Sequence, residues 1–210
     1  MRNYIFDLDG TLINSSEEVM KCFSMTFEKS EYPLDKSRLT PEIIGPPLDE
    51  IIQNLAPEIN DKNKIDELVK NFSYFYDNEQ NDISKIYDGV YEVLETLQKD
   101  NCRLFMATFK PTAPTMRIVS QFNLNYFEEI YTIDKFGEFI TKTDMINIIL
   151  DKYGLDKNET CMVGDAVSDV KSAKSTGVLA IGALWGYGKD KQPLIENSDI
   201  TLKNIKELLK

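Results

Sequence analysis

One stretch decides the fold of this chain: YIFDLDGTL, from Tyr4 to Leu12. Its first three residues form a short apolar run, which is typical of a buried strand. Asp7 and Asp9 follow at the carboxyl end of that strand, the edge at which open α/β sheets bind ligands. Side chains alternate along an extended strand, so these carboxylates can converge on one point. Two like charges this close repel each other, and paired carboxylate oxygens favour a hard divalent cation, Mg²⁺ first.

The composition indicates an ordinary soluble globular protein, with 42% hydrophobic and 28% charged residues. A length of 210 residues accommodates one good-sized core, or a core domain with a small insert. The formal net charge of −11 argues against partners such as nucleic-acid polymers or anionic membranes. No apolar run is long enough to predict a transmembrane helix.

Histidine is absent from the sequence, which excludes His-based catalysis and His-ligated zinc. Acid–base chemistry must therefore fall to carboxylates or lysines. The cysteines at positions 22, 102 and 161 are scattered through apolar contexts and predict reduced packing residues of a cytoplasmic protein. None of them has an arginine six positions further on, as a cysteine-dependent phosphatase loop would need.

The pattern of the chain changes after its first third. Residues 15–84 have helical periodicity and no convincing strand. From Asp88, a candidate helix cap, apolar strands alternate with helices, which indicates an α/β fold with a doubly wound parallel sheet. We therefore expect residues 1–14 and 85–210 to form the core and residues 15–84 a small helical domain. The later strands are predicted at 104–107, 130–133, 161–163, 178–181 and 200–201.

Polar residues stand at the ends of three predicted strands: Asp7, Thr108 and Asp165. Parallel strands place their carboxyl ends at one edge of the sheet, so these side chains can meet. The Thr108 hydroxyl could donate to a phosphate oxygen. The alternative is an ordinary threonine that bonds its local backbone.

Two charged features stand at predicted helix starts. Lys142 follows Thr141, which with Asp144 predicts a capping box, and a cation there is opposed by the helix dipole. A bound phosphate would offset that cost, although lysines are mostly solvated. Asp165 and Asp169 are four residues apart, which predicts one helix face. The helix dipole alone also favours acids at this position.

These residues together resemble the motifs of the haloacid dehalogenase-like (HAD) phosphatases. The stretch Asp7-Leu8-Asp9-Gly10-Thr11-Leu12 resembles the first motif, Thr108 the second, Lys142 the third, and Gly164-Asp165-Ala166-Val167-Ser168-Asp169 the fourth. The resemblance covers nearly the whole chain. It implies a Rossmann-like core, with residues 15–84 as a helical cap of the C1 type.

The resemblance also implies roles for these residues. Asp7 would attack phosphorus and form an aspartyl-phosphate, and Asp9 would be the general acid and base. Thr108 and Lys142 would stabilise the phosphoryl group. Asp165 would bind Mg²⁺ directly, Asp169 would orient a metal-bound water, and Asp9 would offer its backbone carbonyl to the metal.

Further features resemble the phosphoglycolate phosphatase-like and 5'-nucleotidase-like branch of the family. Lys110-Pro111 is a pair common among phosphoglycolate phosphatase-like members, which implies that Lys110 contacts substrate. The loops at 44–48 and 184–188 resemble loops of the same branch. Phe109 departs from the family pattern, which has a small polar residue at this position.

The predicted function is Mg²⁺-dependent hydrolysis of a small phosphomonoester, with phosphoglycolate, a nucleotide or a sugar phosphate left open. The expected partner is therefore a small phosphorylated metabolite, and the protein a monomer or homodimer. A phosphomutase of the same fold and a non-catalytic phosphate-binding or regulatory module are the alternatives. Dehalogenation does not require Asp9, and a receiver domain carries its acceptor on a later strand, so both fit the sequence less well.

Overall fold

The chain divides into two compact units, each with its own hydrophobic core. The larger unit comprises Met1–Asn14 and Ile86–Lys210, and the smaller comprises Ser15–Lys85. A computed structural model describes residues 1–78 and 83–210. Residues 79–82, which fall within the predicted helical domain, lie outside the described residues.

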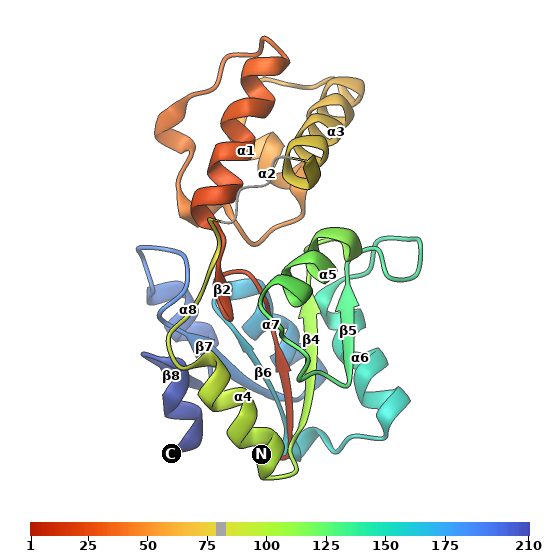
Figure 1. Cartoon of the computed structure of the whole chain (residues 1–210), viewed down its shortest axis with the longest axis vertical. Helices are drawn as coiled ribbons and strands as arrows, with labels where there is room; N and C mark the ends of the chain where they lie inside the picture. Colours follow the sequence, from red (N-terminus) through yellow and green to blue (C-terminus); the bar gives the residue numbers. More distant parts are fainter. Residues whose placement is uncertain (79–82) are drawn as a thin grey trace. The chain divides into compact units, whose positions relative to one another are not determined.

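The larger unit is built on a six-stranded sheet in the order β5-β4-β1-β6-β7-β8, and all its strand pairs are parallel (Figure 1). The first strand therefore lies inside the sheet, with β4 on one side and β6 on the other. The chain builds outward from β1 in one direction and then returns to build in the other, which confirms the predicted doubly wound sheet. The strands are β1 Asn3–Phe6, β4 Arg103–Thr108, β5 Glu129–Thr132, β6 Thr160–Gly164, β7 Leu179–Ala183 and β8 Ile200–Leu202.

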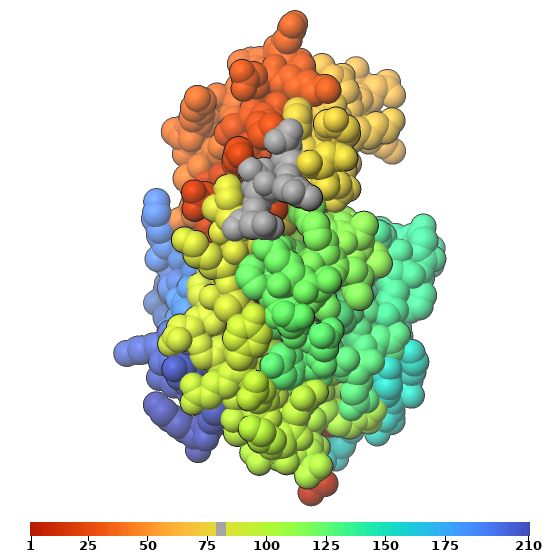
Figure 2. Space-filling model, viewed as in Figure 1, coloured from red at the N-terminus to blue at the C-terminus, as the bar shows by residue number. Residues whose placement is uncertain are grey.

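Helices cover both faces of this sheet. On one face lie α4 (Val90–Lys99), α5 (Thr112–Gln121) and the 3₁₀ turn η4 (Ile205–Leu209). On the other lie α6 (Lys142–Tyr153), α7 (Val167–Thr176) and α8 (Gln192–Asn197), and the short turn η3 (Lys157–Glu159) precedes β6. Figure 2 shows the yellow-green and green atoms of α4 and α5 over the first face. Among the described residues, no helix is long and apolar enough to cross a membrane.

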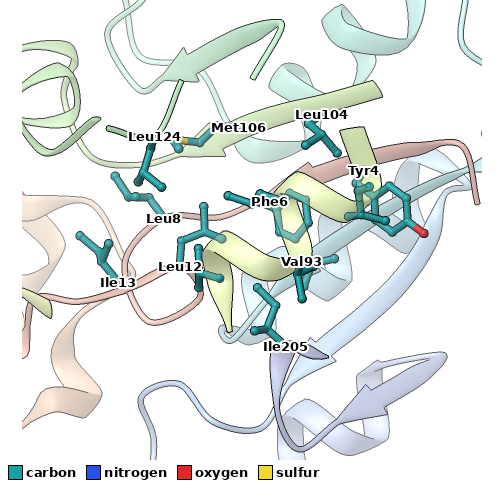
Figure 3. Packing of buried hydrophobic residues seen from close by; sticks show 14 of the residues in the cluster. Tyr4, Phe6, Leu8, Leu12, Ile13, Val93, Leu104, Met106, Leu124 and Ile205 are labelled. Carbon is teal, nitrogen blue, oxygen red and sulfur yellow. The ribbon is translucent and has the colours of Figure 1, made fainter. Parts of the chain in front are cut away.

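The alternation of side chains along β1 connects the strand to both helical layers. Tyr4 and Phe6 point into the layer of α4, where Phe6 lies among Leu12, Val93 and Leu104 (Figure 3). Ile5 points into the opposite layer. Full burial of each such side chain contributes about 1.5–3 kcal/mol. The strand is therefore held from both faces, and its carboxyl end is fixed in place.

The smaller unit contains helices α1 (Ser16–Lys29), α2 (Leu48–Leu55) and α3 (Lys62–Asn78) and the 3₁₀ turns η1 (Lys36–Arg38) and η2 (Pro41–Ile43). Its core is rich in aromatic residues, and the ring centres of Phe23 and Phe72 lie 4.4 Å apart. The chain connects the two units through β2 (Ile13–Asn14) and β3 (Lys85–Ile86), which pair as a separate two-stranded sheet.

The sequence predicted a capping box at Thr141 and Asp144 and a helix cap at Asp88; the first prediction is confirmed and the second is wrong. Asp144 N–H donates to the Thr141 hydroxyl at 3.1 Å, and the Asp144 carboxylate accepts from Thr141 N–H at 2.9 Å. The Asp88 cap is wrong, because α4 begins after Gly89, whose φ is 85°. Asp88 instead pairs with Lys206 at 3.3 Å.

The partly buried carboxylate of Glu129 connects β5 to α6. Glu129 accepts hydrogen bonds from Lys135 at 2.8 Å and from Lys152 and Tyr153 at 2.5 Å each. Burial raises the pKa of Glu129, but these three hydrogen bonds outweigh it and lower the pKa to about 2, from an ordinary value of 4.5. The ionised Glu129 carboxylate therefore contributes its full stabilisation of the fold above pH 4.5, and this contribution is lost as the pH falls toward 2.

We expect Glu129→Gln to lower the free energy of unfolding by about 1 kcal/mol at pH 7. The deficit relative to wild type should shrink as the pH falls from 4.5 toward 2, because the wild-type carboxylate then also loses its charge. Urea unfolding of both proteins across this range measures the difference. Glu138→Gln, at an exposed position in the next loop, is the control and should show no such change. A deficit that is independent of pH would contradict this assignment.

Candidate active site

Three buried carboxylates gather at the carboxyl edge of the sheet. Asp7 directly follows β1, Asp165 directly follows β6, and Asp169 lies in the first turn of α7. One oxygen from each lies within 4.8 Å of the others. Their exposed fractions are 4%, 8% and 0%, so the cluster is largely withdrawn from water. Residues far apart in the sequence thus meet at one point.

Lys142 lies inside this cluster, at the first position of α6. Its ammonium is 2.9 Å from Asp7 Oδ1, and it also donates to Asp169 Oδ1. Burial lowers the pKa of this lysine, but the charges of Asp169 and Asp7 and their hydrogen bonds outweigh burial and raise it. Lys142 is 2% exposed, so the alternative interpretation of this residue as a solvated lysine is wrong.

Three ionised carboxylates would carry more negative charge than the single Lys142 ammonium can balance. Burial raises the pKa of Asp7 to about 7, Lys142 opposes this shift, and Asp169 adds to it. The pKa of Asp165 is raised well above its usual value by burial and then by the charges of Asp7 and Asp169. Buried carboxylates are stable when they are paired or bind a metal. An all-oxygen donor set with excess negative charge fits a hard divalent cation.

The local geometry of Asp165 and Asp169 differs from the prediction. Asp165 precedes α7 and does not share a helix face with Asp169. Its Oδ1 accepts from the Thr11 hydroxyl at 3.2 Å and its Oδ2 from Tyr187 N–H at 2.8 Å. Asp169 folds back and accepts from Ala166 N–H at 3.0 Å. A tight turn into the helix, and not helical spacing, therefore brings the two carboxylates together.

Asp9 and Lys110 form a second ion pair beside the cluster. Lys110 Nζ lies 3.1 Å from each carboxylate oxygen of Asp9, and the two side chains are 7% and 12% exposed. The backbone N–H of Lys110 also donates to the Thr108 hydroxyl oxygen at 3.1 Å. Lys110, which the sequence assigned to substrate, is thus held against Asp9.

Thr108 ends β4 at the same edge of the sheet. Met106 pairs with Phe6 in the register of β4 with β1, and this brings Thr108 beside the segment that carries Asp7. The side chain is 1% exposed. The strand-end position expected from the sequence is therefore observed, and its hydroxyl oxygen also accepts from the local backbone.

The loop after β7 supports the site in a way that the sequence did not reveal. Trp185 Nε1 donates to the Thr11 carbonyl at 2.9 Å, and Tyr187 N–H donates to Asp165. Lys191 Nζ donates to the Gly186 carbonyl at 2.9 Å and also to that of Tyr187. The available signal was the glycine spacing in Trp-Gly-Tyr-Gly, which predicted only a loop.

Comparison with known proteins agrees with this geometry. The family model described as haloacid dehalogenase-like hydrolase matches residues 4–183. The chain therefore belongs to the haloacid dehalogenase-like hydrolases, and within them it is a phosphatase.

Two curated relatives illustrate this class. The Pyrophosphatase PpaX of Halalkalibacterium halodurans is 30% identical, with 98% of this chain and 94% of the relative covered. A phosphoglycolate phosphatase of Mannheimia succiniciproducens is 28% identical, with 98% and 95% covered. Among solved structures, a haloacid dehalogenase-like family hydrolase from Streptococcus pneumoniae has a TM-score of 0.86 at 25% identity, covering 100% of this chain and 97% of that one.

Gly186→Ala tests the support from the loop. An added Cβ would lie 2.3 Å from both Asp165 Cβ and the Gly10 carbonyl oxygen, and neither can move without displacing the cluster. We expect stability to fall by about 1–3 kcal/mol. We expect phosphatase activity to fall about 100-fold, because a small displacement of site groups has large effects on rate. Thermal unfolding and phosphate release measure the two effects.

Gly137→Ala is the matched control. It places a Cβ in open space at a φ of 78°, so it costs backbone energy of about 1–2 kcal/mol without touching the cluster. Equal loss of activity in both variants would show that lowered stability alone explains the effect.

Proposed function

We propose that the protein is an Mg²⁺-dependent phosphatase that hydrolyses a small phosphomonoester through an aspartyl-phosphate on Asp7. The observation that carries this proposal is the buried contact of 2.9 Å between Lys142 Nζ and Asp7 Oδ1 within a cluster of carboxylates. Inorganic pyrophosphate is a second candidate substrate, because one of the relatives is named a pyrophosphatase.

In the proposed reaction, an oxygen of Asp7 attacks phosphorus and the bond from phosphorus to the leaving oxygen breaks. Asp9 gives a proton to that leaving oxygen and afterwards takes one from a water. The water attacks the phosphorus of the aspartyl-phosphate, which releases phosphate and restores the Asp7 carboxylate. Lys110, at 3.1 Å from both Asp9 oxygens, would orient this carboxylate toward the leaving group.

The chain supplies further groups for the charge that develops on the phosphoryl oxygens. The Lys142 ammonium already lies beside Asp7, and the Thr108 hydroxyl stands at the same edge. Mg²⁺ would be held by Asp7, Asp165 and the Asp9 backbone carbonyl, with Asp169 in a supporting position. When bound, it would neutralise the carboxylates and polarise the phosphoryl oxygens.

We assign residues 15–84 as the cap that limits access of water during transfer. Support comes from the compact unit Ser15–Lys85, which has its own core and is inserted after the first strand. We place the protein in the cytoplasm, in keeping with its free cysteines. A phosphomutase would leave phosphate on a sugar, and a binding module would turn over no ester. A panel of phosphoglycolate, a nucleoside monophosphate, a sugar phosphate and pyrophosphate, with detection of free phosphate, separates these functions.

Asp7→Asn should lower phosphate release from para-nitrophenyl phosphate by on the order of 10³-fold or more, because an amide cannot form the covalent intermediate. The fold should survive, because the amide is similar in shape and the Lys142 ammonium keeps its second carboxylate partner, Asp169. Asp151→Asn, on the exposed side of α6, is the matched control and should retain full activity. Turnover that persists in Asp7→Asn would exclude Asp7 as the nucleophile.

Removal of divalent metal with EDTA should abolish turnover, and Mg²⁺ should restore it. Mg²⁺ at 100 times its Kd should also stabilise the fold by about 2.7 kcal/mol, which raises Tm by about 5–10 °C. The reason is that the cation offsets the repulsion among the three buried carboxylates. Asp165→Asn should weaken this thermal shift. A Tm that does not respond to Mg²⁺ in wild type would contradict the proposed metal site.

A further inference from the structure

An aromatic ring packs on the lysine that contacts the proposed nucleophile. Phe109 directly follows Thr108, and the centre of its ring lies 5.3 Å from Lys142 Nζ. The same nitrogen is 2.9 Å from Asp7 Oδ1. A phosphoryl group that reaches Asp7 therefore lies near the lysine that this ring covers. A leaving group large enough to extend from the phosphorus could then reach the ring.

A second ring extends this surface into solvent. Phe139 stacks on Phe109 with ring centres 6.2 Å apart and planes 22° apart, and it is 58% exposed. It belongs to the loop that joins β5 to α6 at the carboxyl edge of the sheet (Figure 1). The next residue, Ile140, is buried, and α6 begins shortly after it with Lys142. Both ends of this stacked pair are thus anchored close to the site.

We call Phe109 and Phe139 the aromatic wall. The aromatic wall is apolar, whereas the cluster beside it consists of carboxylates and an ammonium. Glycolate carries a carboxylate on a single methylene group and pyrophosphate carries only phosphate oxygens, so neither offers a flat apolar surface to a ring face. A flat unsaturated ring in the leaving group would instead stack on the exposed face and bury apolar surface.

We propose that the aromatic wall selects phosphate esters whose leaving group carries a flat ring, as in nucleoside or aryl monophosphates. This inference rests on the proposed function and narrows its substrate class. Phe109 departs from the small polar residue of the motif that the sequence resembles, so the proposal rests on the observed rings and not on that motif. Phe139, at 58% exposure, is the part of the wall that is open to a ligand.

The same loop offers a matched control. Phe136 is 53% exposed, but its ring packs on Tyr131 at 6.3 Å and not on Phe109. Phe136→Ala therefore removes an equally exposed ring from the same loop without touching the aromatic wall. A general effect of loop disorder would appear in both variants, whereas an effect on ring recognition would appear only in Phe139→Ala.

The test compares kcat/KM for para-nitrophenyl phosphate, a nucleoside 5'-monophosphate and phosphoglycolate in wild type, Phe139→Ala and Phe136→Ala. Phe139→Ala should lower the ratio of kcat/KM for each ring-bearing ester to that for phosphoglycolate by about 2- to 12-fold, the range expected for one lost aromatic contact. The change should appear mainly in KM. Phe136→Ala should leave both ratios unchanged. In wild type, comparison of kcat/KM for para-nitrophenyl phosphate with that for the nucleoside 5'-monophosphate shows whether the enzyme prefers an aryl or a nucleoside leaving group.

Equal losses for all substrates in Phe139→Ala, or no loss, would overturn the aromatic wall as a specificity element. A wild-type enzyme that releases phosphate only from phosphoglycolate or pyrophosphate would also overturn it, while the proposed phosphatase function would stand. Absence of phosphate release from every substrate, with folded protein and Mg²⁺ present, would overturn both proposals.

Discussion

The site depends on one buried cation. Lys142 contacts Asp7 after the first strand and Asp169 in α7, so its ammonium joins α6 to the end of β1 and to the start of α7. Removing one partner from such a buried pair typically costs 3–5 kcal/mol, because the remaining charge is left without compensation. Those same contacts keep the pKa of Lys142 high despite its burial. The geometry of the carboxylate edge is therefore tied to the charge of a single side chain.

Charge also explains how this site can accept an anion. Three ionised carboxylates beside one lysine would leave a negative surplus, and the whole chain carries a formal net charge of −11. A phosphate dianion would be repelled by that surplus, and in the proposed mechanism a divalent cation at the carboxylates would remove the repulsion. The hydrogen bonds from Thr11 and Tyr187 to Asp165 keep its oxygens in place within the cluster.

Local patterns predicted local structure, and they failed where a partner came from elsewhere in the chain. The Thr141–Asp144 capping box was predictable because both members belong to the same helical turn. Asp88 was predicted as a cap from its position before a helical pattern, but α4 begins after Gly89. Asp88 instead pairs with Lys206, which no local pattern could indicate. The separation of Asp165 and Asp169 suggested a helix face, but the chain enters α7 only after Asp165. The parallel sheet itself was predictable, since apolar runs alternate with helical periodicity along the chain.

The sequence by itself determined which residues stand at the carboxyl edge of the sheet, because strand ends and parallel order fix Asp7, Thr108 and Asp165 to one side. Only the tertiary structure decided what surrounds them. The ion pair of Lys110 with Asp9, the bond from Trp185 to Thr11 and the stacking of Phe139 on Phe109 all depend on the paths of loops. Periodicity and spacing encode the direction of a side chain within one element. They do not encode which distant segment a loop brings against it.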